Sequence, residues 1–462
     1  MEKIVFDTEL VKRYDGPGPR YTSYPTAVQF HEDFAADDYA RLARLSNAKS
    51  DMRQLSLYVH IPFCHSLCYY CGCHKIVTRT PGVAAQYLEY VFKEAALHAE
   101  LYDQDRPVLQ LHLGGGTPTY LSDAEMRLLM EGLSRYYPLL SSGDREYSLE
   151  IDPRTTGPEM LPLLAELGFN RLSMGIQDFD PQVQRAVNRV QEVDHTLGLI
   201  RQARDVGFVS VSVDLIYGLP HQDLDQFEKT LDLIVEARPD RIATYNYAHL
   251  PRMFKAQRLI REETLPSAQT KLALLRHIVE YLTDKGYEYI GMDHFALPED
   301  ELVTARNEGT LQRNFQGYST YADCDLIALG VSSIGRLDTC YSQNLKLRKD
   351  YYASLDAGQL PVFRGVELGP EDVLRRQVIQ GLMCQDVVNM NAIGQRFDID
   401  FRSHFAAELE ALRPLEADGL VEVSEDAIRV TARGRFLLRP IAMTFDEYLP
   451  AERQSGRFSK VI

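Results

Sequence analysis

Six short apolar runs, each followed by a helical pattern, constrain the fold of this chain more than any other feature. The runs are rich in β-branched residues and lie at 55–61, 108–113, 147–151, 171–176, 210–217 and 241–247. The helical patterns lie at 84–102, 122–133, 158–168, 195–207, 225–237 and 268–286. Repeated strand–helix units form a parallel sheet, which right-handed crossovers curl into a full or partial barrel. We therefore expect an α/β partial barrel of six units, with its chemistry at the C-terminal ends of the strands.

The segments on either side of this alternation predict two further parts. Residues 1–50 are irregular, and GPGPRYTSYPT (16–26) contains three prolines and two glycines, which indicates an extended N-terminal arm. Residues 51–365 then form the barrel with a C-terminal extension. Residues 366–462 predict a helical, winged-helix-like domain, because helical patterns at 370–384 and 405–419 precede a hairpin pattern at 420–434.

Composition excludes several classes of protein. The 462 residues include 45% apolar residues, enough for a large core. The formal net charge of −16 repels nucleic acid and anionic membranes, so we expect no nucleic-acid partner. No run of about 18 apolar residues predicts a membrane span, and the charged start MEKIVFDTELVKRYDG does not resemble a signal peptide. We expect a cytoplasmic protein, and nothing in the sequence demands an oligomer, so we expect a monomer.

Four of the seven cysteines lie within ten residues, directly after the first predicted strand. Cys64, Cys68 and Cys71 form a C-x3-C-x2-C pattern, and thiolates are the ligands that iron–sulfur clusters use. Three thiolates bind three irons of a 4Fe–4S cubane and leave the fourth iron open. A structural zinc site and a closed electron-transfer cluster with Cys73 as fourth ligand are alternatives. The zinc site lacks a second cysteine pair, and we predict that Cys73 is not a cluster ligand.

This cysteine pattern, with Tyr70 before the third cysteine, resembles the radical S-adenosylmethionine superfamily. The resemblance implies that the open iron binds the amino and carboxylate groups of S-adenosylmethionine. It also implies that an electron from the cluster cleaves this cofactor into methionine and a 5′-deoxyadenosyl radical. The pattern is specific for the superfamily and does not indicate the substrate.

Further motifs narrow the resemblance over residues 10–460. They include GPRYTSYPT (18–26), HLGGGTPTYL (112–121), EIDPR (150–154), DLIYGLP (214–220), GMDHFALP (291–298), RNFQGY (313–318) and GVSSIG (330–335). Together they resemble the oxygen-independent coproporphyrinogen III oxidases. The family reaction is the anaerobic oxidative decarboxylation of two propionates of coproporphyrinogen III to vinyl groups, which gives protoporphyrinogen IX for heme synthesis. The alternative is the non-catalytic heme-binding or trafficking paralogue, in which the fourth cysteine is typically replaced and the arm is missing.

The resemblance also implies roles for individual residues. Those expected at a first S-adenosylmethionine are Tyr58, Gly115, Glu150 and Ile334. Those expected at a second are Tyr70, Gly116, Thr117, Gln177, Arg189, Asp214 and Ala248, and Gly72 is a further cofactor-binding candidate. Alone, a triple glycine is as typical of a plain tight turn, and each charged residue is as typical of a structural ion pair. Tyr58, Cys73 and Arg20 are the candidate catalytic residues.

An acidic tetrapyrrole needs cations in its pocket. Arg20, Arg252 and Arg313 each lie within a matched motif and are candidates to bind propionates, although a solvated surface charge is the simpler interpretation of any one of them. Tyr21 and Tyr24 either cover the ring or pack the arm. The reaction also needs an electron donor and a final electron acceptor, which the sequence does not identify. A cluster-based redox regulator that binds DNA through the winged-helix part is disfavoured by the acidic charge.

Overall fold

The chain folds into two compact units. The computed structural model describes residues 4–48, 53–141, 143, 145–321 and 324–449. The barrel unit comprises Phe30–Leu274 and Asp323–Glu367. The terminal unit comprises Met1–Gln29, Leu275–Ala322 and Leu368–Ile462, so it combines both ends of the chain with an internal segment.

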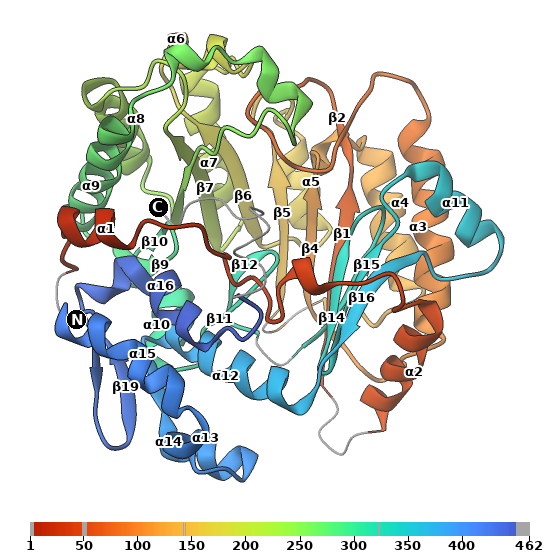
Figure 1. Cartoon of the computed structure of the whole chain (residues 1–462). Coiled ribbons are helices and arrows are strands. Elements are labelled where there is room, and N and C mark those ends of the chain that lie inside the picture. The colour runs from red at the N-terminus through yellow and green to blue at the C-terminus, as the bar shows by residue number, and fades with distance from the viewer. Residues whose placement is uncertain (1–3, 49–52, 142, 144, 322–323, 450–462) are drawn as a thin grey trace. The chain divides into compact units, whose positions relative to one another are not determined.

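A parallel sheet forms the centre of the barrel unit (Figure 1). Within the described residues of this unit, seven parallel strands follow the order β13-β1-β4-β5-β6-β7-β8. Their bounds are Leu55–Ile61 (β1), Val108–Gly115 (β4), Glu146–Ile151 (β5), Arg171–Gln177 (β6), Ser210–Tyr217 (β7), Arg241–Asn246 (β8) and Asp325–Leu329 (β13). The strands β1 and β4–β8 lie where the alternation predicts them. The strand β13, which pairs with β1, is an addition that the alternation did not predict.

The sheet continues beyond β13 as an antiparallel extension and does not close. Its strands are β14 (Ile334–Leu337), β15 (Cys340–Asn344) and β16 (Val362–Glu367), with helix α11 (Arg348–Asp356) before β16. The strand order of the described residues ends at β16 without pairing back to another strand. The predicted partial barrel is therefore confirmed.

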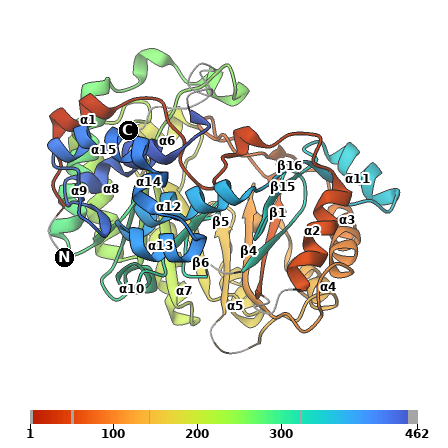
Figure 2. The same cartoon turned by 60° about the horizontal axis from the view of Figure 1, so that its bottom comes forward.

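Helices follow the parallel strands as the sequence predicts. They are α3 (Val83–Ala99), α4 (Asp123–Ser134), α5 (Met160–Glu166), α7 (Val193–Asp205), α8 (Leu224–Ala237) and α9 (Ala268–Asp284). Helix α4 begins with a capping box, in which the Ser122 hydroxyl accepts from the Glu125 amide at 3.3 Å and Glu125 accepts from the Ser122 amide at 2.9 Å. Figure 2 shows α3 and α4 side by side.

A buried carboxyl group connects α3 to the turn between β13 and β14. Glu94 of α3 accepts hydrogen bonds from the Gly330 amide at 2.7 Å, the Tyr351 hydroxyl at 2.5 Å and the Asn344 side chain at 2.5 Å. Its side chain is fully buried, and burial raises the pKa of Glu94 to about 8 although these three donors lower it. Glu94 therefore fixes the turn that leads to Ile334 at the start of β14.

The first fifty residues contain more helix than the sequence indicated. Helix α1 (Thr8–Tyr14) is capped by Asp7, and α2 (Ala36–Asn47) buries Tyr39, Leu42 and Ala43. The expectation of an irregular segment was wrong at these two places, because α1 has only seven residues and α2 has a narrow apolar stripe. Residues 16–26 between them contain no helix, as the prolines and glycines predict.

The C-terminal part of the terminal unit is helical with a small sheet. Its main helices are α12 (Pro370–Gln385), α13 (Met390–Phe397) and α15 (Ala406–Ala417). The predicted hairpin is present as β18 (Val421–Val423) and β19 (Ala427–Val430), and β17 (Val387–Asn389) completes a three-stranded wing. Val378, Leu382, Phe405 and Ile428 are fully buried in one core. The helical, winged-helix-like part of the predicted fold is therefore confirmed.

The N-terminal arm is bound to these helices. The Arg13 guanidinium and the Tyr14 hydroxyl both donate to the Asp418 carboxylate, at 2.7 and 2.6 Å. Further along the arm, the Tyr21 hydroxyl donates to Asp446 at 2.9 Å. These contacts fix a segment that has little regular structure of its own.

Candidate active site

The cysteine loop follows β1 and is closed at its base by two short strands. Strand β2 (Phe63–Cys64) pairs in parallel with β3 (Ile76–Val77), and the Thr78 amide donates to the Cys64 carbonyl at 3.1 Å. The Cys64 and Cys68 thiols are buried and free, and the free Cys71 thiol is half-buried. The structure therefore presents the three predicted ligands on one short loop at the C-terminal end of the first barrel strand.

Two guanidinium groups contact the sulfur of Cys68. Arg154 Nη2 lies 3.3 Å and Arg189 Nη1 lies 3.6 Å from Cys68 Sγ. Both arginines also bind the Asp152 carboxylate, at 2.6 and 3.3 Å. Arg189 was predicted as a site residue, whereas Asp152 and Arg154 were missed. The EIDPR motif contains both, but its signal was assigned to Glu150 alone.

The other two thiols have different environments. Burial raises the pKa of Cys64 to about 11, although the Thr117 hydroxyl donates to its sulfur at 3.5 Å. A hydrogen bond from the Cys73 thiol and the charge of Lys75 lower the pKa of Cys71 to about 6, although burial opposes this shift. Thus Thr117, Cys71 and Cys73 are all placed at the cysteine loop. Cys73 is an exposed residue, although its hydrogen bond to Cys71 and the burial of its sulfur raise the pKa of its thiol.

The donor set fits an iron–sulfur cluster better than a single ion. Among the residues that the structure describes, no three His, Cys, Asp or Glu side chains form a site for one metal ion. In a cubane each thiolate binds a different iron, so its cysteines are spread more widely than the ligands of one ion. The arginines beside Cys68 also place positive charge where an anionic cluster would be held.

The triple glycine at the end of β4 lies against the chain that enters the cysteine loop. A Cβ atom on Gly116 would lie 2.6 Å from the Pro62 backbone. Gly115 has a φ of +112°, and a Cβ there would lie 2.6 Å from the His60 ring. These two glycines thus allow close packing between β4 and β1, which places Gly115 and Gly116 directly beside the predicted cluster loop.

Glu150 lies in a polar network beside these glycines. Its carboxylate accepts from the Gly115 amide at 3.2 Å and lies 3.6 Å from His112 Nε2. Burial opposes ionisation of Glu150, but the hydrogen bonds from His112 and Gly115 hold its pKa below the usual value. The Tyr58 ring stacks on His112 with centroids 5.8 Å apart. The structure thus brings three predicted residues together, namely Tyr58, Gly115 and Glu150.

His60 supports Tyr58 from the same strand. Its Nε2 donates to the His74 carbonyl at 3.0 Å, so its Nδ1 accepts from the Tyr58 hydroxyl, also at 3.0 Å. Burial lowers the pKa of His60 to about 4, so the ring is neutral at pH 7. Sequence reasoning gave His60 no role, because a lone histidine is most often a packed core residue.

Asp214 of β7 is a second carboxyl group, close enough to Glu150 for their charges to interact. Burial and the charge of Glu150 together raise the pKa of Asp214 to about 7. The Ser173 hydroxyl donates to Asp214 at 3.5 Å. Near neutral pH this site therefore holds one ionised carboxylate and one carboxyl group close to its titration point.

Gln177 and Arg189 meet over Gly175 of β6. A Cβ atom on Gly175 would lie 2.7 Å from Gln177 Nε2 and 3.1 Å from Arg189 Nη2. Gln177 ends β6 with a φ of +70°. In the part of the chain that the structure describes, Gln177 Oε1 and Arg189 Nε are buried without a hydrogen-bond partner. Unsatisfied buried polar atoms of this kind fit a site that binds a polar cofactor.

Gln257 joins two further predicted residues. Its side-chain amide donates to the Tyr70 carbonyl at 3.0 Å and to the Ala248 carbonyl at 3.2 Å. Gly72 packs against Phe254, whose ring would lie 3.1 Å from a Cβ at that position. The segment after β8 thus contacts the cysteine loop at Tyr70 and Gly72, and the sequence gave no signal for Gln257.

The remaining predicted residues lie apart from these contacts. Ile334 begins β14 opposite Gln343 of β15. Arg252 is exposed in the segment after β8. Arg20 and Arg313 belong to the terminal unit, where Arg313 Nη1 donates to the Arg20 carbonyl.

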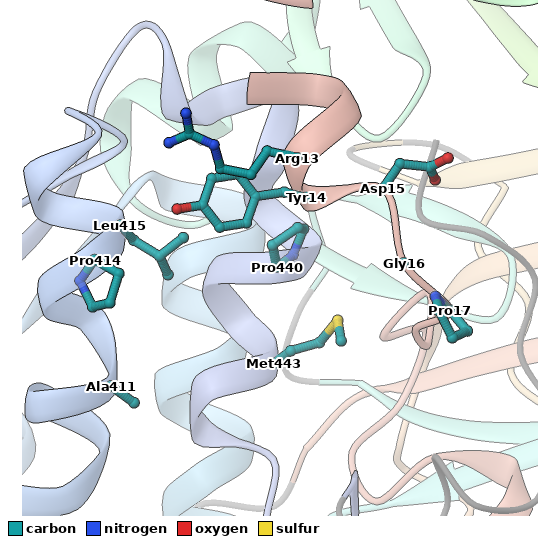
Figure 3. A pocket seen from close by; sticks show the side chains of 10 residues that line it. All are labelled: Arg13, Tyr14, Asp15, Gly16, Pro17, Ala411, Pro414, Leu415, Pro440 and Met443. Carbon is teal, nitrogen blue, oxygen red and sulfur yellow. The ribbon is translucent and has the colours of Figure 1, made fainter. Parts of the chain in front are cut away.

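The terminal unit also contains a pocket of about 540 Å³ (Figure 3). Arm residues 13–17 form one wall, and the opposite wall comprises Ala411, Pro414, Leu415, Pro440 and Met443. Figure 3 shows the Arg13 and Tyr14 side chains over this wall. None of the predicted site residues lines this pocket, so the pocket and the candidate active site share no residue.

The chain matches known proteins over its full length. Residues 58–234 match the Radical SAM superfamily and residues 368–437 match the HemN C-terminal domain. The chain is 47% identical to the oxygen-independent coproporphyrinogen III oxidases of Pseudomonas aeruginosa and of Escherichia coli K12, over 100% of both chains in each case. The chain belongs to the oxygen-independent coproporphyrinogen III oxidase family. This result confirms the resemblance that the motifs indicated.

A solved structure of this oxidase family supports the same fold. The Escherichia coli coproporphyrinogen III oxidase, described as a radical SAM enzyme, superposes with a TM-score of 0.91 at 47% identity. The superposition covers 97% of this chain and 100% of that one. Membership of the radical SAM superfamily implies a 4Fe–4S cluster and S-adenosylmethionine as cofactors. As the sequence predicts, none of the helices in the described parts of the chain is long and apolar enough to cross a membrane.

Proposed function

We propose that this chain catalyses the anaerobic oxidative decarboxylation of coproporphyrinogen III to protoporphyrinogen IX in heme biosynthesis. Two propionate side chains lose carbon dioxide and become vinyl groups. The observation that carries the proposal is the 47% identity to oxygen-independent coproporphyrinogen III oxidases over the whole chain. The three thiols at the C-terminal end of β1 support it with the chemistry that a radical mechanism needs.

The cysteine loop holds the proposed cluster through Cys64, Cys68 and Cys71. When bound, the cluster and S-adenosylmethionine supply a 5′-deoxyadenosyl radical that removes a hydrogen atom from the propionate carbon β to the carboxylate. Arg154 and Arg189 place positive charge beside Cys68, which favours binding of an anionic cluster.

Two groups of side chains would bind two S-adenosylmethionine molecules. At the first site, Glu150 stays ionised and faces the cationic or hydroxyl groups of the cofactor, with Tyr58, Gly115 and Ile334 around it. At the second, Arg189 and Gln177 offer the unsatisfied Nε and Oε1 atoms, and Asp214 accepts or donates a hydrogen bond near neutral pH. The other members of the second group are Tyr70, Gly116, Thr117 and Ala248, and Gly72 supports the loop between them.

Cys73 is proposed to act in turnover and not as a cluster ligand. It follows Cys71 after one residue, and its thiol hydrogen-bonds to the Cys71 sulfur. We propose that Tyr58 and Arg20 are the other catalytic residues, Tyr58 through its stacked position beside Glu150 and Arg20 through contact with the substrate.

Cleavage of S-adenosylmethionine consumes one electron, so the enzyme needs an electron donor for the cluster. Loss of carbon dioxide from the substrate radical releases one electron, so it also needs an acceptor. We propose that it acts in the cytoplasm as a monomer, where a reducing environment keeps thiols available for the cluster. The seven cysteines, all of which lie among the described residues, form no disulfide with one another.

The test is an anaerobic assay of cluster-reconstituted protein. The mixture contains S-adenosylmethionine, a strong reductant, coproporphyrinogen III and a cell extract that supplies the acceptor, and porphyrins are separated and measured by fluorescence after oxidation. Protoporphyrin is expected with the wild-type protein and not with Cys64→Ser. Formation of 5′-deoxyadenosine without a change in the porphyrin would show that the substrate is wrong. If neither product forms while heme binds stoichiometrically, the heme-trafficking function replaces the oxidase.

A further inference from the structure

Three arginines from distant parts of the sequence meet in the terminal unit. Arg20 lies on the arm, Arg313 on β11 (Gln312–Asn314) and Arg439 on α16 (Leu438–Ala442). Arg20 pairs with Asp293 at 2.5 Å. Arg313 donates to the Arg20 carbonyl, and Arg439 donates to the Pro19 carbonyl at 2.9 Å. Arg313 and Arg439 are each only 4% exposed, so two permanent cations are buried beside a third.

The electrostatic potential at this arginine cluster is positive. Burial and the charges of Arg20 and Arg313 together lower the pKa of Arg439 to about 10, against the opposing effect of Asp293. Burial and Arg313 likewise lower the pKa of His294 to about 4. His294 is therefore neutral at pH 7, and its Nδ1 donates to the Met292 carbonyl at 2.7 Å. A place that disfavours protonation of a histidine favours an anion.

Arg313 has a donor to spare within this cluster. Its Nε is buried and, among the residues described, has no hydrogen-bond acceptor. Its guanidinium lies over the Tyr318 ring, 5.5 Å from the ring centroid, which fixes its plane. A planar guanidinium with free Nε matches a carboxylate through two parallel hydrogen bonds. Neutral donors would suffice to bind the carbonyls of the arm, so three permanent cations exceed what that task needs.

We propose that Arg20, Arg313 and Arg439 form a carboxylate-binding site that takes a propionate of the tetrapyrrole substrate. This inference rests on the proposed function, because the substrate supplies the carboxylate. Arg439 was not among the residues that the sequence indicated, and it adds a third cation to Arg20 and Arg313. Arg313 and Arg439 also donate to the Arg20 and Pro19 carbonyls of the arm. Binding of a propionate and ordering of the arm would therefore stabilise the same arrangement of these arginines.

The test compares two ligands that differ only in charge. Coproporphyrin III and its tetramethyl ester are titrated into the reconstituted enzyme in the same mild detergent, and binding is followed by porphyrin fluorescence. The variant is Arg313→Met. The matched control is Arg306→Met, which removes a guanidinium of similar burial in the same unit, one that binds the Tyr289 carbonyl and Glu288 instead. Circular dichroism checks the fold of each variant.

We expect Arg313→Met to weaken binding of the acid about tenfold or more and to leave binding of the ester unchanged. Arg306→Met should leave the ratio of the affinities for the acid and the ester unchanged. If Arg313→Met does not fold, Arg20→Gln gives the same comparison at a more exposed position, where the side chain is 37% exposed.

Equal losses for acid and ester, or no loss at all, would overturn the inference and assign these arginines to holding the arm alone. The wild-type preparation is assayed in parallel for conversion of coproporphyrinogen III. Conversion together with unaltered discrimination in the variants rejects the carboxylate site and leaves the oxidase function intact. Absence of conversion by the wild type rejects the proposed function itself.

Discussion

Glu94 offers a direct test of how burial of a carboxyl group affects the pH dependence of stability of the barrel unit. We expect Glu94→Gln to remove a pH dependence of stability that the wild-type protein shows between pH 4.5 and pH 8. Glutamine resembles the protonated carboxyl group in shape but has no proton to release. The Gly330 amide and the Asn344 side chain donate to different oxygens of Glu94, so glutamine keeps an acceptor for one of them, and the lost hydrogen bond lowers stability at every pH alike.

The sign and size follow from the two pKa values of this carboxyl group. Glu94 titrates near 4.5 when unfolded and at about 8 when folded, so between these values the folded state holds a proton that the unfolded state releases. Stability therefore falls as pH rises through this window, by about 1.4 kcal/mol per pH unit. From pH 5 to pH 8 the loss is roughly 4 kcal/mol for the wild type relative to Glu94→Gln.

The assay is urea-induced unfolding, followed by circular dichroism at pH 5, 6, 7 and 8. Burial lowers the pKa of the neighbouring His98 to about 3, so His98 contributes the opposite slope below pH 6.5. Both proteins carry His98, and the difference between them isolates Glu94. Parallel stability curves for the two proteins would refute the conclusion that the folded protein holds Glu94 protonated.

Three other substitutions test separate parts of the barrel unit. Cys73→Ser should keep a reducible 4Fe–4S signal in electron paramagnetic resonance but reduce turnover, and loss of the cluster would show that Cys73 is a ligand. Arg154→Leu removes a donor 3.3 Å from Cys68 Sγ, so a redox titration should give a more negative cluster potential, and an unchanged potential would count against this role. Arg106→Met leaves the buried Asp325 carboxylate, now 2.6 Å from Arg106, without its cationic partner, with the Ser46 hydroxyl as a remaining donor. It should lower the free energy of unfolding by about 3–5 kcal/mol in urea, whereas a loss below about 1 kcal/mol would contradict the inferred cost.

Local patterns were sufficient for the parallel core of the barrel. The run at 55–61 coincides with β1, and the run at 210–217 coincides with β7, because strands buried on both faces are continuous apolar runs. The strand β13 was missed although it is fully buried. It has only five residues, and no local pattern indicates that Leu326 pairs with Ser56, which lies 270 residues earlier in the chain.

The residues of the candidate site also fall into two groups, those that the sequence indicated and those that it did not. The cysteine loop and the glycines after β4 are contiguous motifs, so the sequence indicated Cys64 and Gly116 directly. Contacts between distant segments were not accessible, because neither Gln257 nor Arg439 lies in a pattern that names its partner. Their roles depend on carbonyl groups of Tyr70 and Pro19, and a carbonyl leaves no trace in residue identity.

The division of the terminal unit over three chain segments affects the order of events during synthesis. Arg13 and its partner Asp418 are 405 positions apart, and a ribosome that adds about 5–20 residues per second needs roughly 20–80 s between them. All segments of the barrel unit have been translated by Glu367, whereas the terminal unit still lacks α12 and everything after it. The nascent chain therefore passes through a stage in which the cysteine loop has its complete sheet while the arm has not yet met the helices that bind it.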